Sequence, residues 1–330
     1  MTRAWLPLVL MTALIIALGI YADAHSSAFL SKENLSSLLL AALPLIIVSM
    51  GQAVALLVGG FDVSVAALMT FCVVLASFTL TPTTSGFALV TGSLALIGVG
   101  IGVGLFNAIL IRVLRLPSIV ATLGTLSILE GGSLWLRGYP QGAINTDVTS
   151  ALTKSVLGWL PIAFVVVVAV AALADGWLYR TRSGLALRAV GTDERSARRL
   201  GMPTGRIVIL AFVVCSVMAS IAGFYLAAEV QVGSPIIGNQ ALESIAAAVL
   251  GGASLAGGRG SFFGTMLAAF FLTEIDNVLP FFQQPTEYAE MAIGALILLA
   301  LVLYQAPELI ARFRSSRQSI DAVDAPATAA

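Results

Sequence analysis

Long runs of apolar residues limit the folds available to this chain more than any other feature does. A helix that crosses the hydrocarbon core of a bilayer needs about 20 mainly apolar residues. Only 10% of the residues are charged and 58% are hydrophobic, whereas a soluble domain carries about 25% charged residues. The sequence therefore predicts an all-α, polytopic membrane helix bundle with about ten transmembrane helices. We place these helices at residues 6–22, 37–58, 62–80, 86–111, 117–136, 156–176, 207–228, 240–256, 261–279 and 288–304.

Two of these segments have compositions that favour an interrupted helix. Segment 37–58 contains Pro44, and segment 240–256 is rich in small residues. Irregular backbone is tolerated at membrane depth only where protein or a cavity covers it. Both segments are therefore candidates for broken or partly re-entrant helices.

The basic residues predict how the chain is oriented, because cytoplasmic loops collect Lys and Arg. If the N-terminus is cytoplasmic, fourteen of the 17 basic residues fall inside and three fall outside, namely Lys32, Arg137 and Lys154. Both termini are therefore expected in the cytoplasm. An alternative is that the first apolar run is a secretory signal cleaved near Ala22-Asp23-Ala24.

The predicted helices and loops divide the chain into three regions. Residues 1–35 are expected to form the first helix and the first outward loop. Residues 36–317 form the transmembrane domain, in which 180–206 is a cytoplasmic loop. Residues 318–330 are small, polar and acidic, a composition typical of a disordered tail.

No group of catalytic or metal-binding residues is visible. The sequence lacks Gly-x-x-x-x-Gly-Lys, His-Glu-x-x-His and Cys-x-x-Cys patterns, so it predicts neither a nucleotide-binding loop nor a metal site. Cys72 and Cys215 lie within apolar runs and are expected to pack there. His25 has no neighbouring His or Cys with which to form a ligand set. We therefore expect no enzyme activity, no bound cofactor and no nucleic-acid partner.

Loop 180–206 concentrates charge in a chain that is otherwise poor in it, with nine of the 34 charged side chains. Thr192 or Asp193 can cap a helix of about two turns, with acids in its first turn and arginines in its last turn. Gly201 suits the left-handed position after the helix end. This capped helix predicts a protein-docking surface, and the alternative is a basic loop that binds anionic lipid. The candidate docking residues are Gly191, Asp193, Glu194, Ala197, Arg198, Arg199, Leu200 and Gly201.

Polar and glycine residues within the apolar regions are candidates for a translocation path. Ionisable groups at membrane depth face the bundle or a wet cavity, and paired glycines permit tight turns. The alternatives are hydrogen bonds that hold helices together and ordinary turns. The candidates are Gln52, Gly59, Gly60, Asp62, Ser64, Asn107, Thr122, Glu130, Glu243, Gly251, Gly252 and Ser254.

A weak internal repeat accompanies these candidates. Gly59-Gly60 is followed by Asn107 and a proline, and Gly251-Gly252 is followed by Asn277 and a proline. Transporters are often built from repeats with the path between them, although chance similarity between glycine-rich apolar segments gives the same pattern.

Four blocks in order carry a resemblance that spans roughly residues 40–300. The chain resembles the permease subunits of bacterial ATP-binding-cassette importers of the ribose/xylose/arabinose type. The blocks start at Leu57-Val58-Gly59-Gly60-Phe61-Asp62, at Gly104-Leu105-Phe106-Asn107 with Leu116-Pro117-Ser118, at Ala189-Val190-Gly191-Thr192-Asp193-Glu194, and at Ile245-Ala246-Ala247-Ala248-Val249-Leu250-Gly251-Gly252. The resemblance implies a type II importer-like fold in a bacterial inner membrane.

The resemblance also implies partners. In such permeases the loop between helices 6 and 7 docks on the ATPase subunit. The working unit would contain two permease subunits, two ATPase domains that bind ATP and Mg, and a periplasmic solute-binding protein, all surrounded by membrane lipid.

The polar residues also bear on the solute. The predicted helices place no Lys or Arg at bilayer depth, and an anion without a fixed cationic partner is costly to desolvate. We therefore expect a neutral sugar or polyol, then a nucleoside, then a branched-chain amino acid. Two other classes stay open: an ion-coupled secondary transporter, which would not need a docking helix, and a lipid-modifying enzyme, which would need a reactive cluster.

Overall fold

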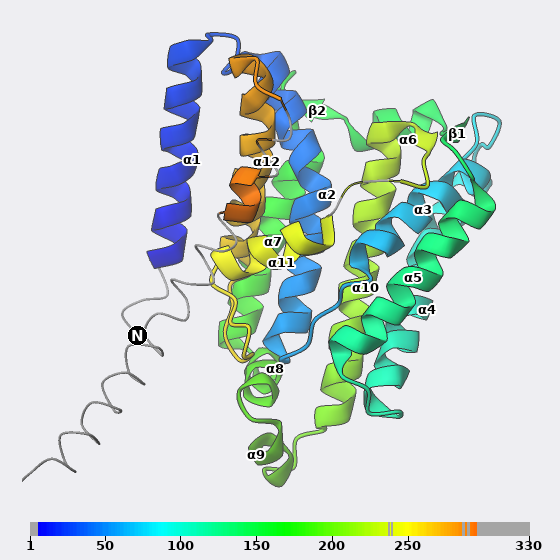
Figure 1. Cartoon of the computed structure of the whole chain (residues 1–330), viewed down its shortest axis with the longest axis vertical. Helices are drawn as coiled ribbons and strands as arrows, with labels where there is room; N and C mark the ends of the chain where they lie inside the picture. The colour runs from blue at the N-terminus through cyan, green and yellow to red at the C-terminus, as the bar shows by residue number, and fades with distance from the viewer. Residues whose placement is uncertain (1–5, 237, 239, 286–287, 289–290, 296–330) are drawn as a thin grey trace, which may run out of the picture.

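The computed structural model describes residues 6–236, 238, 240–285, 288 and 291–295. This part of the chain is a bundle of α-helices with short strands at one end (Figure 1). Its helices are α1 (Leu6–His25), α2 (Lys32–Leu57), α3 (Val65–Thr79), α4 (Phe87–Arg112), α5 (Ser118–Leu136), α6 (Thr146–Leu152), α7 (Ile162–Arg180), α8 (Arg182–Thr192), α9 (Glu194–Arg199), α10 (Thr204–Val230), α11 (Gln240–Leu250) and α12 (Phe262–Val278), which continues into a 3-10 turn (Leu279–Phe282). Strand β1 (Gln141–Ala143) pairs with β4 (Val232–Gly233), and β2 (Ser155–Val156) pairs with β3 (Leu160–Pro161).

Seven helices within the described residues are long and apolar enough to cross a membrane, rather than the ten expected. These are α1, α2, α4, α5, α7, α10 and α12. The expected helices at 62–80 and 240–256 form only α3, with 15 residues, and α11, with 11 residues. At 1.5 Å per residue both are shorter than the roughly 30 Å hydrocarbon core. The expected helix at 288–304 lies mostly outside the described residues.

The reason for the short helices is visible in the chain around them. The residues between α2 and α3 form an extended segment that starts at the Gly59 turn, and those after α11 form a loop that starts at Gly251. Residues that sequence patterning assigned to helices are therefore used in turns. In segment 37–58 the expected interruption at Pro44 is wrong. Helix α2 is one continuous helix through this proline.

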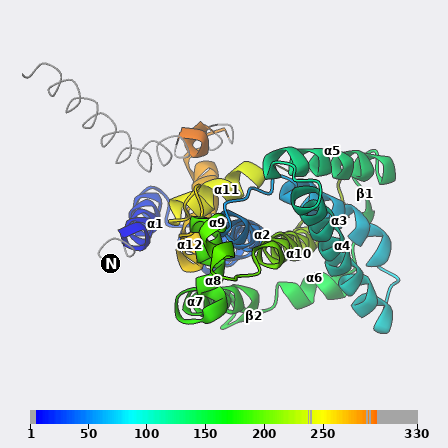
Figure 2. The same cartoon turned by 90° about the horizontal axis from the view of Figure 1, so that it is seen from below.

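Helices α2 and α10 form the centre of the bundle. Seen along the bundle, they lie between α7, α11 and α12 on one side and α3, α4 and α5 on the other (Figure 2). Most of the central stretch of α2 is buried, whereas α1, α4, α5 and α7 expose large apolar side chains. Trp135 at 85% and Leu173 at 73% exposure are examples. An apolar exterior of this extent is stable only in lipid.

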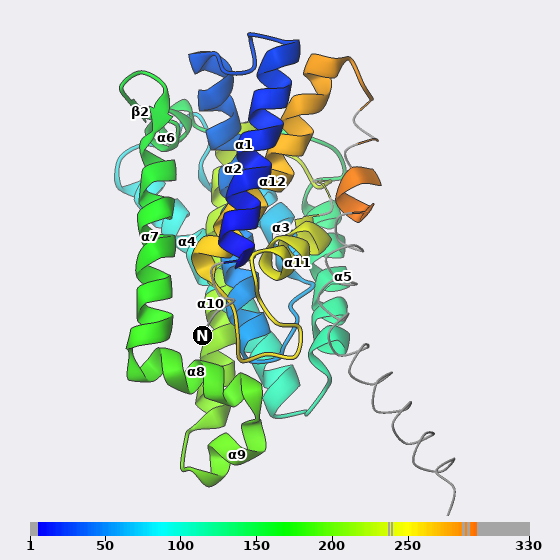
Figure 3. The same cartoon turned by 90° about the vertical axis from the view of Figure 1, so that its left-hand side faces the viewer.

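The charged loop 180–206 projects from one end of the bundle. It contains α8, which was not expected, and the expected short helix, which is α9 (Figure 3). Strands β1 and β2 and helix α6 lie at the opposite end (Figure 1).

The two Gly-Gly turns occupy similar places, since one follows α2 and the other follows α11. The asparagines do not correspond in the same way. Asn107 lies on α4, the second helix after Gly60, whereas Asn277 lies on α12, the first helix after Gly252.

Candidate coupling surface and translocation path

Helix α9 is fixed by the cap that the sequence predicts. Asp193 is the N-cap, and its Oδ1 accepts hydrogen bonds from the Arg195 and Ser196 N–H groups at 2.9 and 3.3 Å. The hydroxyl and N–H of Ser196, together with the N–H and charge of Arg195, hold the pKa of the Asp193 carboxyl below its ordinary value. Gly201 has a φ of 80°, which confirms the left-handed position after the helix end.

Ala197 and Leu200 lie three residues apart, on α9 and at its C-cap, but their environments differ. Ala197 is buried against Ala108, Val190 and Phe212, whereas Leu200 is 77% exposed. The alanine therefore holds α9 against the bundle, and the leucine is left on the outer surface.

An ion pair joins α9 to the end of α4. Arg112, the last residue of α4, donates to both carboxylate oxygens of Glu194 at 2.9 and 3.1 Å, and Arg198 donates to Oε1 at 2.8 Å. Burial acts to raise the pKa of Glu194, but the two arginines outweigh it and the pKa is lowered. The contribution of this carboxylate to stability is therefore present above its ordinary pKa and is lost as the pH falls through the lowered value. The pair is intact at neutral pH.

A polar groove of about 1040 Å³ runs beside this ion pair. Its lining combines residues of α9 with residues near the end of α4 and the start of α10. They are Ile111, Arg112, Arg115, Asp193, Glu194, Arg195, Arg198, Arg199 and Gly205.

Gly191, near the end of α8, connects this surface to the end of α2 and to Gly258 in the loop after α11. A Cβ at Gly191 would overlap the carbonyl oxygen of Leu57 and lie 2.6 Å from the nitrogen of Gly258. Gly258 N–H itself donates to the Leu57 carbonyl at 3.0 Å. Three segments that are far apart in the sequence, 57–60, 191 and 257–258, thus meet backbone to backbone, and only glycine permits this approach.

The Gly-Gly turns differ in what they contact. Gly59 has a φ of 76° and ends α2, while a Cβ at Gly60 would lie 2.8 Å from the ring of Phe212. Gly251 packs directly on the backbone of Gly264 in α12, and Gly252 has a φ of 103°. Ser254 is buried in the loop that follows.

A buried polar cluster lies between the α2–α3 segment and helices α4, α5 and α10. The Asp62 carboxylate accepts from Ser64 N–H at 3.0 Å and from the Ser64 hydroxyl at 2.5 Å. Asn107 Nδ2 donates to Ser64 Oγ at 3.0 Å and to Asp62 Oδ2 at 3.5 Å. Ser216 from α10 donates to Asp62 Oδ2 at 3.4 Å, and Thr125 from α5 donates to Asn107 Oδ1 at 2.6 Å.

The cluster brings together three of the expected path residues, Asp62, Ser64 and Asn107. Thr122 lies beside it and accepts from Val63 N–H at 3.2 Å. Thr125 and Ser216 were not candidates on sequence grounds. Thr125 follows Thr122 by one helical turn, a spacing that places both on one face, whereas nothing in the local sequence around Ser216 marks it.

Gln52 lies on α2 near this cluster, with Cys215 between them. Its Oε1 accepts a weak bond from Cys215 Sγ at 3.8 Å. Within the described part of the chain, its fully buried Nε2 has no hydrogen-bond partner, nor does the buried Ser49 hydroxyl one turn away. Buried polar atoms of this kind normally have partners. Among the described residues, Gln52 therefore lies near the Asp62 cluster without joining its hydrogen bonds.

The structure does not bring Glu130 or Glu243 into the cluster. Glu130 is exposed on α5 while Thr122, Thr125 and Leu129 of the same helix are buried. Glu243 is half-buried in the first turn of α11. Their expected path roles remain predictions.

Apolar helices that cross the membrane, a buried polar cluster between them and a capped charged loop at one end together define a multi-pass helical membrane protein of the transporter class. The chain belongs to the family of permease components of the branched-chain amino acid transport systems, whose sequence model matches residues 34–301.

Several import system permease proteins are similar to this chain along most of its length. The autoinducer 2 import system permease protein of Enterobacter sp. (strain 638) is 35% identical, over 85% of this chain and 81% of its own length. Those of Salmonella typhi and Yersinia enterocolitica serotype O:8 are 34% and 33% identical, over 87% and 93% of this chain and 82% and 85% of their own lengths. No solved structure is significantly similar to the chain.

Family membership agrees with the resemblance seen in the sequence motifs. The chain is a permease subunit of an ATP-binding-cassette importer and not an enzyme. Its partners are those of the family: an ATPase, a substrate-binding protein and a second permease.

Proposed function

We propose that this permease carries a neutral, polyhydroxylated solute of the sugar type, and that autoinducer 2, which the relatives named above import, is the first solute to test. One observation supports this proposal most directly. Among the described residues no Lys or Arg is buried, and the buried polar side chains are hydroxyls and amides together with Asp62 and Glu274. Hydroxyls and amides suit solute hydroxyl groups, whereas an anion would require a cationic partner.

Two linkages support a coupling role for loop 180–206. A force on α9 acts on α4 through the Glu194–Arg112 ion pair, and Asn107 lies on the same helix, five residues before Arg112. A force on α8 acts through Gly191 on the ends of α2 and of the 251–260 loop. ATP and Mg would bind the partner ATPase and not this chain. Closure of the ATPases would thus change the packing around the Asp62 cluster.

Uptake into proteoliposomes containing the complete importer tests the solute class. We expect ATP-dependent accumulation of autoinducer 2 or of a neutral sugar, and competition between neutral polyols but not sugar phosphates. The family description makes branched-chain amino acids the second candidate. Accumulation of leucine, or of a sugar phosphate, without competition from any polyol would contradict the proposal.

We also propose that the chain lies in the bacterial inner membrane with both termini in the cytoplasm. Support comes from the positions of the charges: Arg112, Arg115, the arginines of loop 180–206 and Arg259 lie toward one end of the bundle, and Lys32, Arg137 and Lys154 toward the other. The end that bears α9 would therefore face the cytoplasm.

Thiol labelling tests this orientation. Cys72 and Cys215 are both completely buried. They should not react with the reagent, so any labelling comes from the introduced cysteine. In spheroplasts an impermeant maleimide should label Ser150→Cys, which is exposed on α6, and should label Leu200→Cys only after the membrane is permeabilised. Labelling of Leu200→Cys in intact spheroplasts would reverse the orientation.

A further inference from the structure

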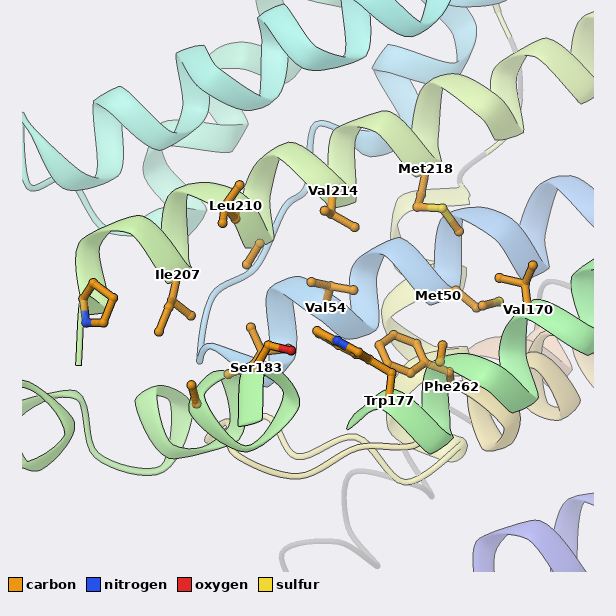
Figure 4. A pocket seen from close by; sticks show the side chains of 15 residues that line it. Met50, Val54, Val170, Trp177, Ser183, Ile207, Leu210, Val214, Met218 and Phe262 are labelled. Atoms are coloured by element: carbon orange, nitrogen blue, oxygen red, sulfur yellow. The ribbon is translucent and has the colours of Figure 1, made fainter. Parts of the chain in front are cut away.

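An apolar groove opens on the outer face of the bundle between α2, α7, α8 and α10. Its volume is about 580 Å³. Figure 4 shows Ile207, Leu210, Val214 and Met218 along α10 facing Val54 of α2 and Trp177 of α7. Leu210 is 61% exposed and Trp177 is 40% exposed. The groove lies within helices that span the membrane, so its occupant comes from the lipid phase or from another membrane helix.

The length of the groove distinguishes between these two occupants. Along α10 it extends from Pro203 to Met218, which is about 22 Å at 1.5 Å per residue. A complete transmembrane helix would need roughly 30 Å, whereas one leaflet together with its headgroup region is about 20–22 Å thick. The groove therefore has the length of one phospholipid in a single leaflet and is shorter than a second spanning helix.

The residues that line the groove are uncharged, but two arginines flank its lining residues at one end. Arg182 precedes the lining residue Ser183, and Arg206 lies in the first turn of α10, next to the lining residue Ile207 and four residues before Leu210, a spacing that places Arg206 and Leu210 on neighbouring positions of the helix surface. Both arginines are exposed, and neither takes part in the ion pairs found among the described residues. The other end, at Met50 and Met218, is apolar.

We propose that this groove binds an anionic phospholipid, with an acyl chain along α10 and the phosphate held by Arg182 and Arg206. An apolar slot of one-leaflet length with a cationic mouth matches the two chemical parts of such a lipid. Basic sites between transmembrane helices bind anionic headgroups in this way. The proposal does not depend on the solute or on the coupling role proposed above.

Trp177 provides a direct probe because it lines the groove. The chain has four tryptophans, and a variant with Trp5→Phe, Trp135→Phe and Trp159→Phe retains Trp177 alone. The full chain is reconstituted in nanodiscs with increasing fractions of phosphatidylglycerol or phosphatidylcholine brominated on the acyl chains. We expect brominated phosphatidylglycerol to reach half-maximal quenching at a lower mole fraction than brominated phosphatidylcholine. The two mole fractions should differ by at least about fivefold, because each arginine that contacts the headgroup contributes a factor of about five.

Two sets of variants in the same background separate binding from general charge and from misfolding. Arg182→Gln with Arg206→Gln should remove the preference for phosphatidylglycerol, whereas Arg195→Gln with Arg199→Gln on α9 should retain it. Ala174→Phe, which fills the groove from α7, should reduce quenching by both lipids. Equal quenching by the two lipids in the parent, a preference that survives loss of Arg182 and Arg206, or no quenching by either lipid would each overturn the proposal.

Discussion

Replacing Gly191 with alanine is expected to lower uptake by the assembled importer at least about tenfold while the protein still inserts in the membrane. The added Cβ would overlap the Leu57 carbonyl oxygen and lie 2.6 Å from the Gly258 nitrogen. Both neighbours are backbone atoms, so no side chain can rotate away. Inserting even one carbon at a closely packed site costs about 1–3 kcal/mol, and here the cost falls on the contact of α8 with Leu57 and Gly258. We expect ATP-dependent uptake to fall at least about tenfold, since about 1.4 kcal/mol corresponds to a factor of ten.

Gly176→Ala in α7 is the matched control. No atom of the described residues lies within 4 Å of the Cβ that it would gain, and alanine is the better helix former. Uptake by this variant should equal that of the parent, and immunoblots of membranes should show equal amounts of both variants. Parental uptake by Gly191→Ala would mean that the close approach of α8 to Leu57 and Gly258 plays no part in transport.

Replacing Asp62 with leucine is expected to lower the apparent Tm of the purified protein by on the order of 10 °C. The substitution keeps the approximate size of the side chain but removes the acceptor shared by Ser64, Asn107 and Ser216. Each buried donor that loses its partner costs on the order of 1–3 kcal/mol, and each kcal/mol lowers the Tm by roughly 2–4 °C. Asp62→Asn, which retains one acceptor oxygen, should show a smaller decrease. Thermal unfolding in nanodiscs measures both effects.

Asp147→Leu serves as the control because Asp147 is an exposed acid on α6. A surface substitution of this kind is expected to change stability by no more than about 0.5 kcal/mol, which corresponds to a Tm within about 2 °C of the parent. If Asp62→Leu unfolds at the same temperature as this control, the cluster contributes no stability. A decrease as large for Asp62→Asn as for Asp62→Leu would show that the charge, and not the number of acceptors, holds the cluster together.

Local chemistry allowed the docking loop to be predicted in detail. Asp193 caps α9 and Gly201 follows it in the left-handed conformation, because a cap and a helix stop depend on residues within one turn. The long apolar runs also fixed the all-α class and the position of most membrane helices. Composition is sufficient there, since a segment of about 20 apolar residues has few other stable environments.

The sequence did not predict which face of each helix is buried, and the physical reason is that the solvent is lipid. A membrane helix is apolar toward lipid and apolar toward its neighbours, so hydrophobic periodicity gives little indication of which face is buried. Thr122, Thr125 and Glu130 lie on one helix, yet the structure buries the two threonines and exposes the glutamate. Sequence patterning had treated Glu130 as a path residue on equal terms with Thr122.

The sequence by itself determined the class of protein, the capped helix and the charge difference between the two ends of the bundle. Only the tertiary structure decided that α3 and α11 are short, that Ser216 joins Asp62 and Asn107, and that Gly191 inserts between Leu57 and Gly258. Caps and apolar runs are set by neighbours along the chain. Contacts among residues that lie 45 or 154 positions apart depend instead on how whole helices pack, and that packing is a property of the bundle rather than of any segment within it.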